Sequence, residues 1–177
     1  YLLWATQGVR TKVPGRVLRT VPSAGNRQSI ETYLAVTREI TDDQGKVLYK
    51  RGLWRYMPLE HGLVHLGSPE PLEELVSRAA LDQEFVGRAP VTFMWSTIPY
   101  RTEWRYSEAS HKVIALDAGH VCQNLYLAAG SIGCGTCAIA AYHQESADDL
   151  LQLSNPDEFV IYMAPVGKMS VVEAAED

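Results

Sequence analysis

The chain has 177 residues, of which 46% are hydrophobic and 21% are charged, and its formal net charge at pH 7 is -5. That length is enough for one domain with a sizeable core, so we expect residues 1–177 to fold as a single domain. The net negative charge does not favour binding to nucleic acid or to an anionic membrane. No apolar run approaches the roughly 20 residues of a membrane span.

The first 37 residues predict a helix, a loop, a turn and a strand. Residues 1–8 are typical of the end of a helix that Gly8 closes. Residues 10–19 are polar and contain Pro14 and Gly15, so we expect a loop there, and residues 22–25 predict a turn. Residues 29–37 mix apolar and β-branched side chains, which indicates a helix start or a strand, and residues 33–37 favour the strand.

The middle of the chain predicts three strands and a helix. After a turn at 42–45, two short strands at 53–57 and 62–66 are joined by a polar loop. Residues 71–81 predict a helix with an apolar face, and residues 91–98 are almost continuously apolar, which indicates a buried central strand. The apolar face of the helix consists of Leu72, Leu75, Val76 and Ala79.

The longest predicted helix spans residues 109–130 and is rich in Ala and Gly, which allows close packing against neighbours. After it, small residues at 136–142 predict a strand, residues 146–153 predict a short helix capped by Ser146, and residues 158–166 predict a last buried strand. The mixture of elements predicts an α+β domain. One side of the long helix carries Val113, Leu116, His120, Asn124 and Leu127, with Val121, Leu125 and Ala128 adjacent.

The three cysteines, Cys122, Cys134 and Cys137, are too few and odd in number for a disulfide-stapled secreted protein. We therefore expect a cytoplasmic protein. Cys134 and Cys137 form a C-x-x-C pair, but no further ligands at suitable spacing suggest zinc, and we expect no metal site. A structural role for the pair is favoured over a redox role, because the pair lies in a Gly-rich link rather than at a strand-to-helix junction.

Two segments combine small residues with groups that suit a flat ligand. The stretch Pro22-Ser23-Ala24-Gly25-Asn26-Arg27-Gln28 exposes main-chain N–H groups, and its Asn and Gln side chains both donate and accept, as the pyrimidine edge of an isoalloxazine ring requires. Residues 132–142 are small enough for a ligand to lie against the backbone. The alternatives are a surface loop and a tight helix-to-strand connection.

Three further places carry polar groups of chemical interest. His120, Gln123 and Asn124 form either a polar network that supports a site or satisfied polar groups of the core. Lys168, which follows Gly167 at a strand end, can bind phosphate or simply face solvent. Before the long helix, Arg105-Tyr106 offers a phenol that can act as an acid beside a guanidinium that stays protonated.

The order of these segments resembles the SagB-type dehydrogenase branch of the nitroreductase-like flavoproteins. The PSAG turn followed by ETY, and the GH-x-x-QN helix followed by a G-x-G link, are specific in combination. The matching stretches cover nearly the whole chain in the family's order. They are LLWATQG (2–8), RTVPSAGNRQSIETYLAV (19–36), EWRYSEASHK (103–112), DAGHVCQNLYLAAGSIGCGTCAIAAY (117–142) and EFVIYMAPVGK (158–168).

The resemblance implies a nitroreductase-like α+β fold, with a mostly antiparallel central sheet around a long buried helix, and a homodimer with FMN at each subunit interface. The turn from Pro22 to Gly25 packs on the flavin in this pattern, with Asn26 near its pyrimidine edge. Ala140 and Ala141 fall where the family places the backbone N–H that faces flavin N5, and Lys168 falls near the phosphate. The dimer is expected on physical grounds too, because half a flavin cleft exposes a large apolar patch.

The expected activity is a two-electron hydride transfer between NAD(P)H and a small electron-poor acceptor, such as a nitro or quinone compound. One alternative is a peptide azoline-to-azole dehydrogenase, and another is a non-catalytic relative that keeps only the dimeric fold. Azoline-oxidising relatives carry a Lys-Tyr pair where this chain has Arg105-Tyr106, which argues against a base mechanism that depends on lysine.

Two other departures concern positive charge. The Arg-rich segment resembling R-R-S-x-R, which grips the phosphate in many relatives, would precede Tyr1 and is not in this sequence. Many relatives carry Arg where this chain has Ala109, and Lys112 replaces another basic position. Both departures concern contacts to phosphate or substrate.

Overall fold

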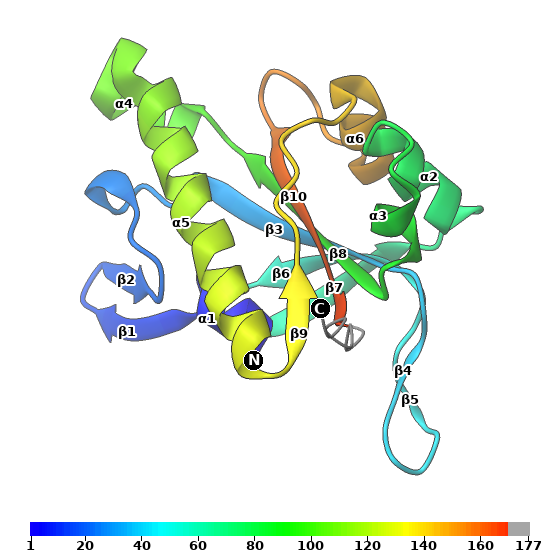
Figure 1. Cartoon of the computed structure of the whole chain (residues 1–177). Helices are drawn as coiled ribbons and strands as arrows, with labels where there is room; N and C mark the ends of the chain where they lie inside the picture. The colour runs from blue at the N-terminus through cyan, green and yellow to red at the C-terminus, as the bar shows by residue number, and fades with distance from the viewer. Residues whose placement is uncertain (170–177) are drawn as a thin grey trace, which may run out of the picture.

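The computed structural model describes residues 1–169, which are built around a six-stranded antiparallel sheet in the order β7-β6-β3-β8-β10-β9 (Figure 1). The sheet and the long helix beside it confirm the α+β class and the antiparallel arrangement. The strands are β3 (Ile30–Val36), β6 (Gly52–Met57), β7 (Gly62–Gly67), β8 (Val91–Thr97), β9 (Cys134–Thr136) and β10 (Phe159–Lys168).

Two helical layers cover opposite faces of the sheet. The long helix α5 (Ser110–Ser131) lies on one face, while α2 (Leu72–Ala79), α3 (Glu84–Arg88) and α6 (Gln144–Leu151) lie on the other (Figure 1). Successive side chains of a strand point to opposite faces. In β8, Trp95 therefore belongs to the core cluster with α5, whereas the neighbouring Met94 belongs to the cluster with α2 and α6. Both faces of the central strands are buried, as the continuous apolar run predicted.

Only one flank of α5 faces the core. Ala118, Val121 and Leu125 are buried against the sheet. The stripe that the sequence groups on one side of this helix is largely on the outside, because Leu116 is 54% exposed and Leu127 is 66% exposed. The helix therefore divides into a buried flank and an outward flank that carries large apolar side chains.

Residues 10–19, which were predicted to be a loop, form most of a hairpin. Strands β1 (Val9–Val13) and β2 (Arg16–Arg19) pair antiparallel around a turn at Pro14 and Gly15. The loop prediction was wrong because polar side chains are compatible with a two-stranded hairpin whose faces are mostly solvated. A second hairpin, β4 (Ile40–Thr41) and β5 (Val47–Tyr49), surrounds the turn predicted at 42–45 and projects from the body (Figure 1).

Several helices differ in extent from the sequence-based expectation. The predicted helix at the start is α1 (Leu2–Gln7), and the turn predicted at 22–25 overlaps the single-turn helix η1 (Ala24–Asn26). Two further elements were not predicted, namely α3 and the segment α4 (Tyr100–Tyr106) with η2 (Ser107–Ala109). His143, rather than Ser146, caps α6, since its ring nitrogen accepts a hydrogen bond from the Ser146 backbone N–H at 3.3 Å.

The predicted strand at 136–142 is correct only at its beginning. Strand β9 ends at Thr136, and beyond it a single bridge joins Ile139 to Met163 of β10. The segment from β9 to α6 thus runs beside β10 with most of its backbone outside the ladder. No helix in the described residues 1–169 has the length and apolar character needed to cross a membrane.

Candidate functional site

The turn at residues 22–28 is held in one conformation by its own polar side chains. The Ser23 hydroxyl accepts a hydrogen bond from the Gln28 N–H at 2.9 Å, and the Gln28 side-chain amide donates to the Asn26 side-chain oxygen at 2.7 Å. Asn26 in turn donates to the Val17 carbonyl of β2 at 3.0 Å. The predicted ligand-binding side chains therefore also fix the turn against the first hairpin.

A buried carboxylate connects the same turn to α5. Both carboxylate oxygens of Asp117 lie 3.1 Å from the Ala24 backbone nitrogen, which donates to them. Burial raises the pKa of Asp117 above its usual 3.8, and the bonds from the Ala24 N–H and the Ser23 hydroxyl act in the opposite direction. The turn is consequently attached to the core at one defined point of the long helix.

The structure brings Arg105 and Tyr106 next to this turn, although they follow Gly25 by 80 and 81 positions in the sequence. Gly25 has a φ of 56°, and a Cβ atom placed on it would lie 2.8 Å from the Tyr106 hydroxyl and 3.2 Å from the Arg105 Nε. A residue without a Cβ atom allows this approach without displacing the two side chains, and glycine adopts this backbone conformation at little cost. The guanidinium of Arg27 lies 4.3 Å from the ring centre of Trp104, which adds a cation–π contact between turn and helix α4.

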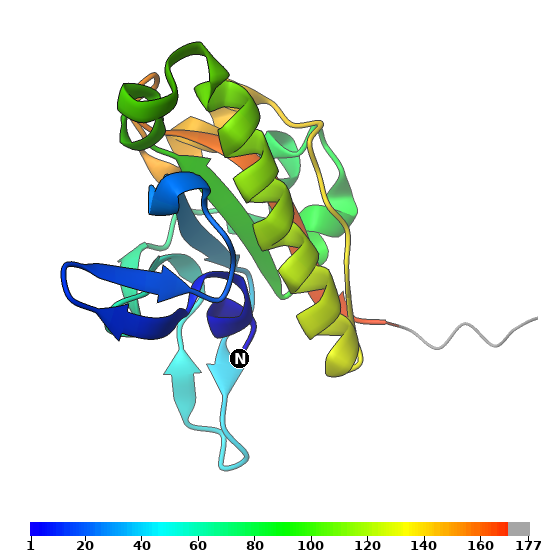
Figure 2. The ribbon, with the colours of Figure 1, turned by 90° about the vertical axis from the view of Figure 1, so that its left-hand side faces the viewer.

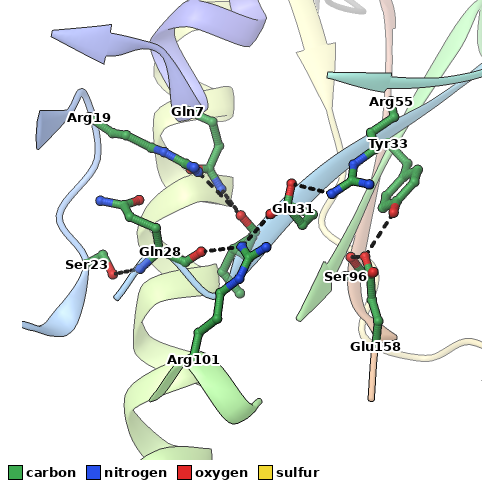
Figure 3. Close-up of polar contacts among 11 residues, drawn as sticks. Gln7, Arg19, Ser23, Gln28, Glu31, Tyr33, Arg55, Ser96, Arg101 and Glu158 are labelled. Carbon is green, nitrogen blue, oxygen red and sulfur yellow. Dashed lines mark hydrogen bonds and ion pairs between the residues drawn. The ribbon is translucent and has the colours of Figure 1, made fainter. Parts of the chain in front are cut away.

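A network of charged side chains lies beneath the turn, and the sequence did not single it out (Figure 3). Glu31 of β3 is buried and forms ion pairs with Arg101 of α4 and, at 3.3 Å, with Arg55 of β6. Arg101 also donates to the Gln28 carbonyl at 2.9 Å. Glu31 thus ties three elements to the turn. A charged residue inside a strand that is otherwise apolar was the sequence signal for it.

Residues 137–143, which overlap the small-residue segment predicted at 132–142, are fixed by groups on both sides. The Ala138 N–H donates to the Tyr126 hydroxyl of α5 at 2.8 Å, and the Gln83 side-chain amide donates to the Ala141 carbonyl at 3.3 Å. Ala140 and Ala141 are exposed, and within residues 1–169 neither of their backbone N–H groups donates to a protein acceptor. This segment therefore presents two free main-chain donors on a fixed backbone.

Lys168 lies at the end of β10, where Gly167 and Lys168 pair with Gly135 and Cys134 of β9. Gly135, Gly167 and Lys168 line a hollow of about 730 Å³ whose lining also includes Arg38 and Arg88. The lining found in the described residues includes these three cations and no carboxylate. Arg88 is itself paired with Glu84, so the hollow is basic with one partly neutralised group. Such a lining suits an anionic group.

The two small-residue segments attach to opposite sides of α5. Asp117 holds the turn and Tyr126 holds Ala138, and these two positions are nine residues apart. At 3.6 residues per turn, nine residues rotate by about 180° modulo full turns and advance about 13.5 Å along the helix. Figure 2 shows the same arrangement, with the blue turn on one side of α5 and the yellow segment on the other.

The outward flank of α5 separates these two attachment points. It carries Leu116 and Leu127, while a Cβ atom placed on Gly119 or Gly130 would meet no other atom within 4 Å. A helix flank with exposed leucines and open glycines permits another helix to approach closely.

The polar residues of α5 that the sequence grouped together, His120, Gln123 and Asn124, have different surroundings. Asn124 donates to the Ala5 carbonyl of α1 at 2.9 Å, whereas His120 and Gln123 are exposed, so these three residues do not form one network. Among the described residues no group of three metal-ligating side chains is close enough to hold an ion.

The C-x-x-C pair is held apart by extended backbone. Strand β9 begins at Cys134 and ends just before Cys137, and three extended steps span roughly 10 Å between Cα atoms. That distance exceeds the limit of about 7 Å for a disulfide. Burial raises the pKa of the third thiol, Cys122, to about 11, which keeps it protonated at neutral pH. The structural role favoured for Cys134 and Cys137 stays a prediction.

Comparison with known proteins gives one consistent family. The sequence pattern of the Nitroreductase family matches residues 1–168. A protein from Methanocaldococcus jannaschii that is named as a nitroreductase is 31% identical over 168 residues, which is 95% of this chain and 78% of that protein.

Solved structures agree with this match. A protein from Anabaena variabilis, also named as a nitroreductase, superposes with a TM-score of 0.84 and 25% identity over 94% of this chain. This chain spans only 34% of the length of that protein. The Escherichia coli microcin synthetase McbBCD complex with truncated pro-MccB17 bound shares the fold, with a TM-score of 0.77 and 20% identity over 96% of this chain and 62% of the matched one.

Proposed function

The chain belongs to the nitroreductase family of oxidoreductases, and we propose that it binds FMN and transfers two electrons between NAD(P)H and a small electron-poor acceptor such as a nitro or quinone compound. The observation that carries this proposal is the placement of two flavin-compatible segments on opposite flanks of α5. One segment is the glycine turn with Arg105 and Tyr106, and the other presents the free N–H groups of Ala140 and Ala141.

Because α5 stands between the two segments, we infer that one flavin would be held by segments from two chains. We propose a homodimer in which the outward flanks of the two α5 helices face each other. A two-fold axis along this flank would bring the turn of one subunit toward the 137–143 segment of its partner. The exposed Leu116 and Leu127 would then be buried, and the open Gly119 and Gly130 would admit the neighbouring helix.

The residues present fit FMN in chemistry as well as in position. Ala140 and Ala141 would supply a main-chain donor at N5, and Pro22, Ser23, Ala24 and Gly25 of the partner would lie flat on the ring, with Asn26 and Gln28 at its pyrimidine edge. The flavin, when bound, supplies the acceptance and release of a hydride. Gly167 and Lys168, with Arg38 and Arg88 in the same basic hollow, would hold the phosphate.

Arg105 and Tyr106 are the proposed catalytic pair. Both side chains lie against Gly25, so in this proposal they would be beside the face of the turn that meets the ring. The Tyr106 hydroxyl would donate a hydrogen bond or a proton to the substrate, and the Arg105 guanidinium, which remains protonated, would attract an electron-rich oxygen of a nitro or quinone group.

An absorption spectrum of the purified protein, followed by titration with FMN, tests the proposal directly. We expect flavin bands or saturable FMN binding, and NADH or NADPH should bleach those bands and reduce a quinone. A colourless protein that ignores added FMN would refute the cofactor assignment and leave only the dimeric, non-catalytic relative considered from the sequence. The cytoplasm, expected from the cysteine content, is part of the same proposal.

The runner-up is a SagB-type dehydrogenase that oxidises peptide azolines to azoles. Support comes from the sequence motifs and from the fold shared with the microcin synthetase complex, which was solved with a truncated precursor peptide bound. The Arg105-Tyr106 pair occupies the place of the Lys-Tyr pair of such enzymes. Oxidation of a synthetic azoline peptide that is lost in Tyr106→Phe would favour this activity, whereas quinone reduction without azoline oxidation would exclude it.

A further inference from the structure

A cavity of about 1020 Å³ lies apart from all residues assigned to the flavin. Its lining comes from β3, β6, the end of β7, α2, α6 and the segment between α6 and β10. This is the face of the sheet opposite α5, beside the helices seen in Figure 1. Pockets for organic ligands typically measure about 300–1,000 Å³, so the cavity lies at the upper end of that range.

Leucine side chains form much of its wall. They come from four different segments of the chain, so the apolar surface is spread along the cavity and is not one spot. The group consists of Leu53, Leu66, Leu75, Leu150, Leu151 and Leu153. An extended ligand with several apolar side chains would cover more of this surface than one compact group.

Charged groups of both signs line the same cavity. Arg55 of β6 and Arg78 of α2 supply the cations, and Asp149 of α6 with Asp157 and Glu158 supply the carboxylates. A ligand with a single charge would therefore lie near groups of its own sign as well as groups of the opposite sign. A ligand with one positive and one negative group can place each of them beside protein groups of opposite charge.

The polar side chains at the base of the cavity are held in place by hydrogen bonds and an ion pair within the protein. Glu158 accepts hydrogen bonds from the Tyr33 hydroxyl at 2.9 Å and the Ser96 hydroxyl at 2.5 Å, and Figure 3 shows Tyr33 between Glu158 and Arg55. Burial, followed by the Glu158 charge, raises the pKa of Tyr33, so its hydroxyl stays a donor. Arg55 is fixed by Glu31, and its Nε is buried with no hydrogen-bond partner in the described part of the chain.

We propose that this cavity binds a short apolar peptide with free termini. The peptide carboxylate would lie at Arg55 and Arg78, its ammonium group would lie at Asp157 and Glu158, and its side chains would contact the leucines. A peptide fits better than a free amino acid, because both the volume and the spread of the leucines exceed what one residue fills. This site is independent of the flavin proposal, since the two sets of residues do not overlap.

Binding of trileucine with free termini to the full chain tests the proposal, with N-acetyl-trileucine amide as the uncharged comparison. Methyl-labelled leucines report the position by NMR. We expect saturable shifts of Leu53, Leu66 and Leu153, no shift of the exposed Leu127 on α5, and at least tenfold weaker binding of the capped peptide.

Arg78→Ala should weaken trileucine binding at least tenfold, because Arg78 is exposed on α2 and its loss removes a cation without disturbing the core. Arg16→Ala, which removes an exposed cation of β2 that does not line the cavity, is the matched control and should bind trileucine as the unchanged protein does. Equal binding of the free and capped peptides, unchanged affinity in Arg78→Ala, or shifts that spread to Leu127 would each overturn the proposal.

Discussion

The outward flank of α5 offers a quantitative test of the proposed dimer through Leu127→Ala. Leu127 is 66% exposed in one chain, and full burial of a leucine stabilises by about 1.5–3 kcal/mol. Two-thirds of this range is about 1–2 kcal/mol per side chain, or about 2–4 kcal/mol for the two copies in a symmetric interface. Because about 1.4 kcal/mol corresponds to a factor of ten, the dimer dissociation constant should rise roughly 30- to 700-fold.

Sedimentation velocity over a concentration series measures this change, and quenching of FMN fluorescence measures cofactor affinity in the same samples. Both should weaken together, because each flavin is proposed to use segments from two subunits. Leu48→Ala is the matched control. It removes a leucine that is 52% exposed on the β4–β5 hairpin, away from α5, and it should leave both constants unchanged.

A particular pair of results would refute this reasoning. If Leu127→Ala is monomeric and still binds FMN with unchanged affinity, the flavin does not need two subunits. If the unchanged protein is itself a stable monomer, the outward flank of α5 is not an interface between copies.

Three further substitutions test the site within one chain. Gly25→Ala forces a left-handed backbone that costs about 1–2 kcal/mol and places a methyl group 2.8 Å from the Tyr106 hydroxyl, so urea unfolding should show at least that loss. Glu31→Ala leaves Arg55 and Arg101, which are each about one-third exposed, without their shared carboxylate and should lower the unfolding free energy by about 1–3 kcal/mol. Asp117→Asn keeps an acceptor for the Ala24 N–H without a buried charge, so it should raise stability at pH 7 and change its pH dependence.

The sign for Asp117 follows from its raised pKa. The folded protein holds this proton more tightly than the unfolded chain, so the contribution is most favourable below the usual value of 3.8 and is lost as pH rises through the higher folded pKa. Unfolding measured across this range should therefore show a slope that Asp117→Asn removes. A parallel pH profile in the variant would contradict this, as would full stability of Gly25→Ala or Glu31→Ala in urea.

The sequence predicted a helix or strand correctly where its local pattern of side chains is compatible with only one of the two. The apolar run at 91–98 gave the central strand β8, and the small-residue helix at 109–130 gave α5 almost to its ends. The sequence patterns gave wrong predictions where contact with solvent or with a distant strand decides the secondary structure. Examples are the polar hairpin β1–β2 and residues 137–142, where only one bridge to β10 forms. Backbone pairing depends on partners distant in the chain, which local composition does not encode.

The candidate site, too, was predicted from the sequence only in part. The order of its motifs in the sequence indicated the family and named the turn, the Ala140–Ala141 segment and Lys168. Only the tertiary structure put Arg105 and Tyr106 against Gly25, connected Glu31 to Arg55 and Arg101, and attached the two flavin-compatible segments to opposite sides of α5. The physical reason is that residue type fixes which groups are available, whereas distances between groups far apart in sequence are set by how the helices pack on the sheet.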